Sequence, residues 1–309
     1  MSAHPSVDDL YAVFVATLPA DLVDAASALP VMLRLAPSRD VPWSEVFGHD
    51  VTLGAPALVA EAMPGVAPDV VRDASLAHLL AIIEAFGADR VLDGQVDPTP
   101  ELDRVLSHAR AARDEALARV PAGAGYAPAD AETAAAIRAE HEILRGGEPV
   151  SWSRYLAITH AKQRLGLPAS LALARAAGWD ARRVRTLGRL LDAICVGLQL
   201  HDDVIDWETD LVRGGAWAAL LSARAGTAPA SARRAVFESG ALHHMLQHAA
   251  RSFRAARRRA EVLHLGQLAA WARGRELDVV ELARREAESP GQTNRAHALS
   301  QWAKAVLRG

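Results

Sequence analysis

Three aspartates stand at a spacing that lets them act together on a cation. Asp202, Asp206 and Asp210 recur at every fourth position of a stretch that mixes apolar and acidic residues. Because a helix turns once in 3.6 residues, side chains four apart lie on the same face. Neighbouring carboxylates repel one another unless water screens them or a cation binds them. Carboxylate oxygens are hard ligands, so this face predicts a site for a divalent cation, with Mg²⁺ as the first choice.

A shorter acid pair stands several predicted helices earlier in the chain. Asp89 and Asp93 are also four residues apart, at the end of a long apolar helix. Taken alone, such a pair is typical of a solvated helix end. Two acid arrays in a helical chain can, however, face each other across a bundle core and hold metal ions between them. Both interpretations of Asp89 and Asp93 are open at this point, and in the second one the aspartates of both arrays are metal ligands and catalytic residues.

The residues around these acids predict helices and no sheet. Alanine, leucine and arginine dominate, and apolar residues recur at helical spacing, as in residues 76–83. Glycine and proline mark the turns, and no break is long enough to be a clear linker. A single all-α domain over residues 1–309 is the simplest prediction. The expected helices span residues 7–17, 68–93, 99–118, 129–145, 151–165, 168–177, 181–211, 231–258, 259–286 and 293–307.

The overall composition restricts the class of protein. A net charge of −3 gives no reason to expect nucleic acid as a partner. Cys195 is the only cysteine, so neither an intrachain disulfide nor a thiolate metal cluster can form. Residues 1–10 lack the features of a signal peptide, and the apolar stretch 11–36 is interrupted too often to span a membrane. We expect a cytoplasmic protein without an integral membrane segment.

The second acid array lies in a stretch that resembles the class I isoprenoid synthases. This superfamily includes polyprenyl synthases, squalene and phytoene synthases, and terpene cyclases. Residues 197–206, GLQLHDDVID, resemble the second motif of polyprenyl synthases, in which Gln precedes DDxxD. Residues 199–214 are similar to the corresponding phytoene-synthase stretch. Asp202, Asp206 and Asp210 also match the spacing of the terpene-cyclase triad.

The resemblance covers residues 68–220 and departs from each subfamily at particular positions. Asp89 and Asp93 match the outer acids of the first motif, DDxxD or DxxxD. Arg90 stands where DDxxD has its second Asp, which favours the DxxxD form. Asp206 and Asp210 stand where terpene cyclases usually have Ser or Thr and Glu. These departures leave the subfamily open.

The resemblance implies a fold, a substrate and a cofactor. The fold is a single-domain antiparallel helical bundle with a central active-site cavity. The substrate is an allylic prenyl diphosphate (geranyl, farnesyl or geranylgeranyl diphosphate), which places the protein in isoprenoid biosynthesis. Loss of the diphosphate leaves a carbocation and a multiply charged leaving group, whose charge Mg²⁺ would neutralise as a Lewis acid. The resemblance further implies three Mg²⁺ ions, replaceable by Mn²⁺, and allows a homodimer.

Cationic and polar side chains near the acids are candidates for binding the diphosphate. Lys162 resembles the lysine on the polyprenyl-synthase helix before the second motif, and Arg154 lies earlier on the same predicted helix. A lysine meets phosphate as a point charge, and an arginine can grip it with two parallel hydrogen bonds. Arg213 follows the second motif and would close over the ligand. Gln199, one turn before the second array, would orient metal-bound water or the diphosphate.

Three reactions can follow ionisation: cyclisation, attack by isopentenyl diphosphate, or head-to-head condensation. Phe86, about one turn before the first acid pair, is the candidate cavity wall, because an aromatic face stabilises a cation. Head-to-head enzymes depend on tyrosines, of which this chain has three, and Arg90 interrupts the full DDxxD typical of chain elongation. By elimination, the main prediction is a terpene synthase (cyclase), a lyase. A prenyltransferase, either chain-elongating or head-to-head as in squalene and phytoene synthases, is the alternative, and a non-catalytic protein that binds prenyl diphosphates is the second alternative.

Other groups that could do chemistry have simpler interpretations. His244 and His248 are spaced for a metal, but no Glu completes an HExxH motif, so a packing or surface role is expected. Residues 261–264 form one ExxH, whereas a di-iron bundle needs two. Asp203 points about 100° away from the acid face. We expect Asp203 to support its neighbours or to cap the helix, or else to hold water on the metal.

Overall fold

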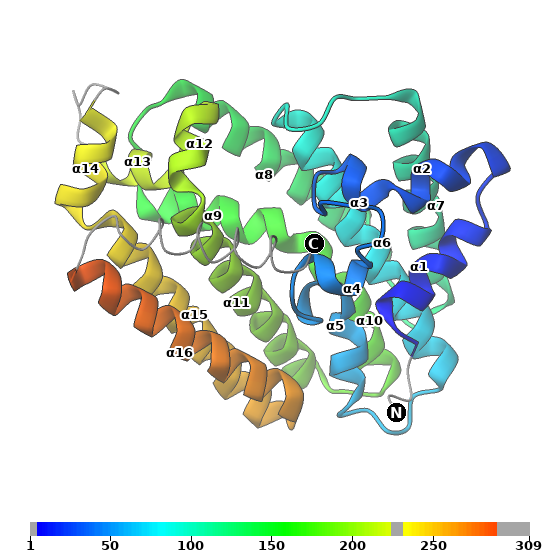
Figure 1. Ribbon diagram of the computed structural model, residues 1–309. Coiled ribbons are helices and arrows are strands. Elements are labelled where there is room, and N and C mark those ends of the chain that lie inside the picture. The colour runs from blue at the N-terminus through cyan, green and yellow to red at the C-terminus, as the bar shows by residue number, and fades with distance from the viewer. Residues whose placement is uncertain (1–4, 224–230, 289–309) are drawn as a thin grey trace. The chain divides into compact units, whose positions relative to one another are not determined.

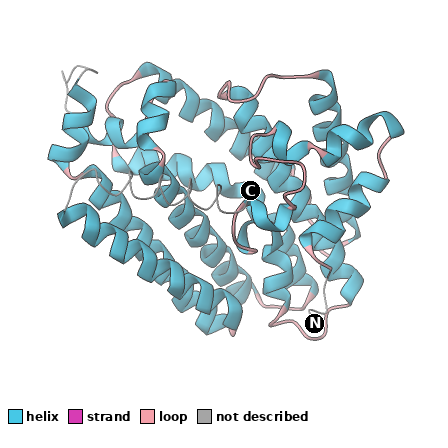
Figure 2. Cartoon of the chain, viewed as in Figure 1, coloured by secondary structure: helices cyan, strands magenta, loops and turns pink. Residues whose placement is uncertain are grey.

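Helices make up every regular element of the residues that the structure, a computed structural model, describes: 5–223 and 231–288 (Figure 2). The all-α prediction is confirmed. Figure 1 labels the α-helices. In chain order the elements are α1 (Val7–Ala16), η1 (Ala20–Leu22), α2 (Val23–Ser27), α3 (Leu29–Met32), α4 (Trp43–Val46), α5 (Val51–Ala60), α6 (Pro68–Leu92), α7 (Pro100–Arg119), α8 (Ala127–Gly146), α9 (Trp152–Lys162), η2 (Gln163–Gly166), α10 (Pro168–Ala176), α11 (Ala181–Ile205), α12 (Trp207–Arg213), α13 (Trp217–Ser222), α14 (Ala232–Ser239), α15 (Ala241–Leu263) and α16 (Gly266–Glu288). None of these described helices combines the length and the apolar character that a membrane crossing requires.

The observed helices differ from the predicted ones mainly at breaks. Predicted helix 181–211 is divided at Asp206, whose backbone (φ −97°, ψ 0°) leaves the helical range. Predicted helix 231–258 is divided at Gly240, which adopts the left-handed conformation with φ 66°. The following break falls at His264, also with positive φ, instead of at 258–259. Short helices between residues 20 and 60, and α13, were not predicted. Predicted helix 293–307 lies outside the described residues.

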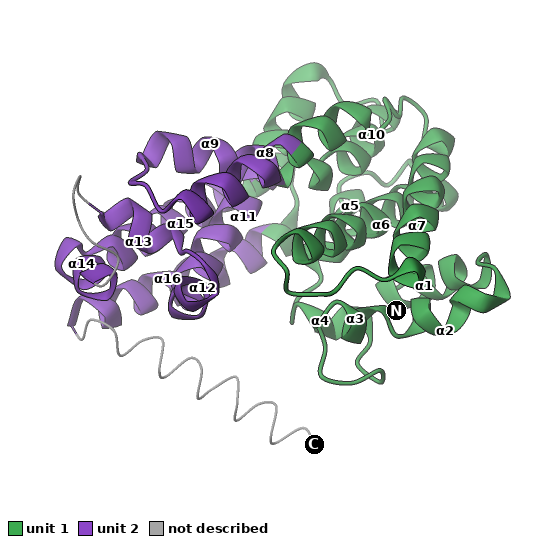
Figure 3. Cartoon of the chain, turned by 90° about the horizontal axis from the view of Figure 1, so that it is seen from above, with its two compact units in different colours: residues 1–134, 163–189, 260–268 green, residues 135–162, 190–259, 269–309 purple. Residues whose placement is uncertain are grey.

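The chain divides into two compact units (Figure 3). Unit 1 comprises residues 1–134, 163–189 and 260–268, and unit 2 comprises residues 135–162, 190–259 and 269–309. Helices α8, α11, α15 and α16 each contribute residues to both units. The single domain over residues 1–309 stays a prediction.

Unit 1 is built around α6, a helix of 25 residues that packs against α5, α7 and α10. Pro68 occupies its first position, where the missing N–H costs no hydrogen bond and the fixed φ suits a helix. Apolar side chains from the N-terminal helices pack with those of α6 and α7 into one core. Its fully buried members include Phe14, Leu22, Leu29, Leu33, Leu79, Leu80 and Ile83.

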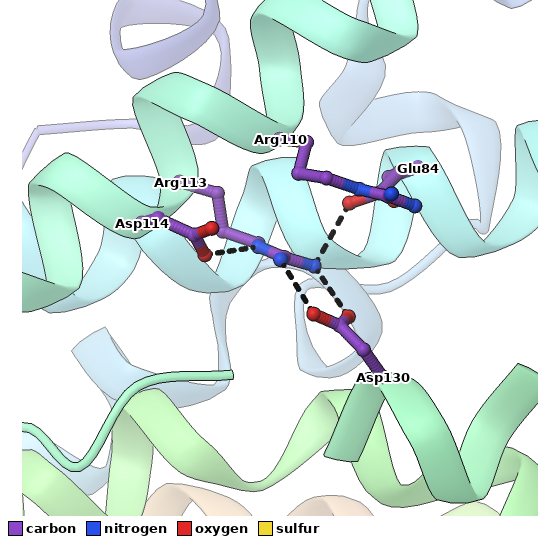
Figure 4. A network of polar contacts seen from close by, with 5 residues as sticks. All are labelled: Glu84, Arg110, Arg113, Asp114 and Asp130. Atoms are coloured by element: carbon purple, nitrogen blue, oxygen red, sulfur yellow. Dashed lines mark hydrogen bonds and ion pairs between the residues drawn. The ribbon is translucent and has the colours of Figure 1, made fainter. Parts of the chain in front are cut away.

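A buried charged network joins α6, α7 and α8 within unit 1 (Figure 4). The Arg113 side chain is completely buried, and its Nη1 lies 2.8 Å from both Glu84 Oε2 and Asp130 Oδ1. Its Nε donates to Asp114 Oδ1 at 2.9 Å. Arg110 donates from Nε to Glu84 Oε1 at 2.6 Å. Because a buried charge is unfavourable unless it is paired, this network fixes the first turns of α8 against α6 and α7.

The core of unit 2 is rich in aromatic side chains. Tyr155, Trp207, Trp217 and Phe253 are all buried in it. A Cβ atom on Gly197 of α11 would lie 2.9 Å from the ring of Phe253 on α15. Glycine at this position therefore lets α15 approach α11 closely, just before the second acid array begins.

Candidate functional site

The second acid array occupies the junction of α11 and α12 in unit 2. Asp202 lies on α11, Asp206 stands between the two helices, and Asp210 lies on α12. Helical hydrogen bonds continue through the junction: Asp206 N donates to Asp202 O at 3.0 Å, and Asp210 N donates to Asp206 O at 2.9 Å. The three backbones therefore stack at the helical period, as the spacing predicts. Asp202 and Asp206 are exposed, and Asp210 is half-buried.

The donor chemistry of this array suits a hard divalent ion. Mg²⁺ is usually bound by one or two carboxylates, and water and substrate phosphate complete its coordination. Among residues 5–223 and 231–288, no three His, Cys, Asp or Glu side chains gather into a group that could hold a metal. The carboxylates of the array fit an ion whose remaining ligands are water and substrate phosphate. The metal roles of Asp202, Asp206 and Asp210 stay predictions.

The first acid pair lies at the C-terminal end of α6 in unit 1. Asp93 is the C-cap residue, and its N–H donates to Asp89 O at 2.9 Å. Asp89 is half-buried and Asp93 is exposed. Between them, Arg90 donates from Nη1 to the carbonyl oxygen of Arg34 at 3.5 Å. Carboxylates at a helix C-terminus oppose the helix dipole, which makes a cation favourable there. That the two arrays face each other stays a prediction.

Asp203 is the buried member of the acidic stretch. Its Oδ2 accepts a hydrogen bond from the Tyr155 hydroxyl, and its Oδ1 accepts one from Gln199 Nε2 at 2.9 Å. Burial raises the pKa of the Asp203 carboxyl to about 8, against the hydrogen bonds from Tyr155 and Gln199, which lower it. Burial and the neighbouring Asp203 raise the pKa of the Tyr155 hydroxyl well above its usual range. Asp203 thus faces the interior, as its 100° offset from the acid face predicts.

Lys162 is held in an ion pair that the local sequence does not predict. Its Nζ lies 2.5 Å from Glu140 Oε2, and the two side chains are only 16% and 12% exposed. Glu140 Oε1 accepts a hydrogen bond from Trp217 Nε1 at 2.9 Å. The charge of Glu140 also raises the pKa values of Asp203 and Tyr155. We call the set of interacting residues on α8, α9, α11 and α13 the polar cluster; its members are Glu140, Tyr155, Lys162, Gln199, Asp203 and Trp217.

A signal for Glu140 was present in the sequence. Ala136 lies four residues before it and Leu144 four residues after it, so Glu140 stands on the apolar face of its helix. An acid on an apolar face is buried only with a partner. The partners come from other helices, 22 residues away in the case of Lys162 and 77 in the case of Trp217.

The other predicted substrate residues occupy varied environments. Arg154 is exposed on α9, and Arg213 is exposed in the last turn of α12. Phe86 is half-buried on α6, with its ring centroid 4.9 Å from that of Phe47. Trp207 is completely buried and belongs to the core of unit 2. The substrate-binding roles of Arg154, Arg213 and Phe86, like those of the polar-cluster residues Lys162 and Gln199, stay predictions.

Solved structures of known proteins match the fold of this chain, whereas the comparisons with protein-family models and with curated proteins found no match. A polyprenyl synthetase from Streptomyces coelicolor A3(2) aligns with a TM-score of 0.66 at 17% identity, over 87% of this chain and 95% of that chain. A polyprenyl synthase from Caulobacter crescentus CB15, complexed with calcium and isoprenyl diphosphate, aligns with a TM-score of 0.53 at 22% identity, over 86% and 97%. A polyprenyl synthase from Roseobacter denitrificans gives 0.51 at 19% identity, over 85% and 98%.

These alignments concern the whole fold, because each covers at least 85% of this chain and 95% of the other. The identities are too low to carry an activity across. The chain has the all-α fold of the class I isoprenoid synthases, in the form that polyprenyl synthases adopt.

Proposed function

We propose that this protein is a metal-dependent enzyme that ionises an allylic prenyl diphosphate, and that its reaction is prenyl transfer. The observation that carries the proposal is the stacked array of Asp202, Asp206 and Asp210 at the α11–α12 junction of a chain with a polyprenyl-synthase fold. The Caulobacter crescentus polyprenyl synthase is complexed with calcium and isoprenyl diphosphate, which supports a divalent ion and a prenyl diphosphate as ligands here.

Ionisation requires that the charge of the leaving diphosphate be neutralised. A divalent ion, Mg²⁺ in the first place, would supply this neutralisation as a Lewis acid when bound. The chain offers oxygen ligands for it from five aspartates: Asp89, Asp93, Asp202, Asp206 and Asp210. Lys162 would add a fixed ammonium group, because Glu140 holds its Nζ at 2.5 Å. Arg154 and Arg213 are exposed and would reach an anion from solvent.

A terpene cyclase is the second candidate, and the interrupted first motif favours it. Arg90 stands where chain-elongating enzymes have the second Asp of DDxxD. The sequence motifs favour the cyclase, whereas the structural matches favour the prenyltransferase, because the matching structures are polyprenyl synthases. A protein that binds prenyl diphosphates without turnover has the same acids and fold.

One assay separates these three functions. The full chain is incubated with Mg²⁺ and geranyl, farnesyl or geranylgeranyl diphosphate, with and without isopentenyl diphosphate. Released diphosphate is measured, and products are identified by gas chromatography and mass spectrometry. A longer prenyl diphosphate that needs isopentenyl diphosphate identifies the proposed prenyltransferase, and a hydrocarbon or alcohol with the carbon number of the substrate, formed without it, identifies a cyclase. A product with twice that carbon number, formed without it, identifies head-to-head prenyl transfer. Thermal stabilisation by substrate and Mg²⁺ without diphosphate release identifies a binding protein. A chain that shows neither diphosphate release nor thermal stabilisation would overturn the proposal.

A further inference from the structure

The Tyr155 hydroxyl and the Asp203 carboxyl connect two helices of unit 2 beside the second acid array. Tyr155 lies on α9, and Asp203 lies on the last turn of α11. We propose that both are positioning residues: their hydrogen bond fixes the direction in which Asp202 and Asp206 point, and Asp203 itself is not a metal ligand. This inference rests on the proposed function, because it concerns how the metal ligands of that function are held.

Both carboxylate oxygens of Asp203 are engaged inside the protein. Oδ2 accepts from the Tyr155 hydroxyl and Oδ1 from Gln199 Nε2, and the residue is only 8% exposed. With an acceptor bond on each oxygen and so little exposed surface, Asp203 offers an ion from solvent less access than its exposed neighbours do. The ligand role therefore falls to these neighbours.

The helix transmits the orientation of Asp203 to the acids around it. Successive residues of a helix are about 100° apart, so Asp202 is turned outward when Asp203 is turned inward. Asp206, three residues further on, is exposed as well. Regular helix α11 ends at Ile205, and Asp206 has non-helical dihedral angles. The last turn of α11 thus precedes a break, where a connection to another helix fixes its rotation.

Tyr155 is held firmly enough to serve as that connection. It is completely buried. Its ring packs against Trp152 at a centroid distance of 5.7 Å and against Trp217 at 5.0 Å. Trp217 in turn donates to Glu140. The loss of a group that hydrogen-bonds a metal ligand directly typically lowers metal affinity 10- to 100-fold, and Tyr155, which acts through Asp203, belongs at the lower end of this range.

The substitution Tyr155→Phe tests the proposal, because it removes the hydroxyl and keeps the ring between its neighbours. Tyr11→Phe is the matched control: Tyr11 is also buried, and its hydroxyl donates to the Ala26 carbonyl oxygen at 2.7 Å in unit 1. Mn²⁺ serves as the probe, and its binding is measured without turnover from the electron paramagnetic resonance signal of the free ion. We expect Tyr155→Phe to weaken Mn²⁺ binding about 10-fold and Tyr11→Phe to leave it unchanged.

A second variant, Asp203→Asn, separates positioning from ligation. If Asp203 positions its neighbours through Tyr155, Asp203→Asn weakens Mn²⁺ binding no more than Tyr155→Phe does, because the asparagine carbonyl can still accept from the Tyr155 hydroxyl. A loss in Asp203→Asn as large as in Asp206→Asn and well beyond that in Tyr155→Phe would make Asp203 a ligand and overturn the proposal. Unchanged Mn²⁺ affinity in Tyr155→Phe overturns it as well, with the proposed function intact. A wild-type chain that neither binds Mn²⁺ nor releases diphosphate overturns both.

Discussion

The Lys162 ammonium lies 2.5 Å from the Glu140 carboxylate, and both side chains are largely withdrawn from water. The second oxygen of this carboxylate accepts a hydrogen bond from Trp217 Nε1 at 2.9 Å. A withdrawn ion pair is costly to break, since either partner alone would be a buried unpaired charge. The lysine that we propose for diphosphate binding is therefore already oriented when the anion arrives, and its orientation depends on a glutamate from another helix.

We expect Glu140→Gln to destabilise the protein by about 3 kcal/mol, because it leaves the Lys162 charge without its counter-ion. The glutamine carbonyl can still accept from Trp217, so the loss reports on the ion pair. Urea unfolding gives the free energy. The double variant Glu140→Gln with Lys162→Met removes the unpaired charge and should recover most of the stability. A double variant no more stable than Glu140→Gln would contradict the assigned pair.

Asp206→Asn should lower kcat about 100-fold while the fold survives, because the exposed carboxylate is proposed as a metal ligand. The readout is diphosphate release at saturating Mg²⁺, together with the thermal midpoint of unfolding. Asp40→Asn is the control, since Asp40 is also an exposed aspartate and lies in neither acid array. Full activity in Asp206→Asn would remove the second array from the metal site.

Arg113→Met should cost about 3–5 kcal/mol of unfolding free energy, since it leaves Glu84 and Asp130 around a site that has lost its cation. The buried guanidinium also lies 4.4 Å from the centroid of the Tyr126 ring, a contact that methionine does not replace. The control is Arg39→Met, which removes an exposed ion pair with Asp24 and should lower the free energy of unfolding by less than about 1 kcal/mol. Equal losses in both variants would mean that burial does not set the strength of the network.

His78 should make stability depend on pH. Burial lowers the pKa of its imidazole from 6.5 to about 4, and its Nε2 lies 2.9 Å from the Thr52 carbonyl oxygen. Because the pKa of His78 is lower in the folded chain than in the unfolded one, the neutral buried imidazole makes its full contribution to stability above pH 6.5. This contribution is lost as the pH falls towards 4, up to about 3 kcal/mol. The stability difference between the wild type and His78→Gln should therefore shrink by about 2 kcal/mol from pH 7.5 to 4.5 in denaturant titrations. A constant difference would mean that His78 is not buried in its neutral form.

The features that depend on local periodicity could be predicted from the sequence. Asp202, Asp206 and Asp210 stack because a helical period alone brings them together, and the inward direction of Asp203 follows from the same geometry. The division of the helix at Asp206 could not be predicted in this way. No glycine or proline marks it, and the neighbouring Trp207 is completely buried, so packing has overridden helical propensity.

The contacts between residues far apart along the chain could not be predicted from the sequence. Glu140 meets Lys162 and Trp217, and Tyr155 meets Asp203 across 48 residues. The sequence predicts that Glu140 and Asp203 face the interior, but it does not predict their partners. Their pairing arises only when the helices of unit 2 pack, which no local pattern encodes.

Helix α12 has only seven residues, and Trp207 is its only buried one, with its ring 5.6 Å from that of Phe237 at 87°. Asp210 lies on this short helix, whereas Asp202 lies on the 25-residue α11. A rotation of α12 about its tryptophan anchor would therefore move the third carboxylate and leave the first in place. Such a rotation would change the spacing of the acids at one end only, and would let the array accommodate ions of different radius.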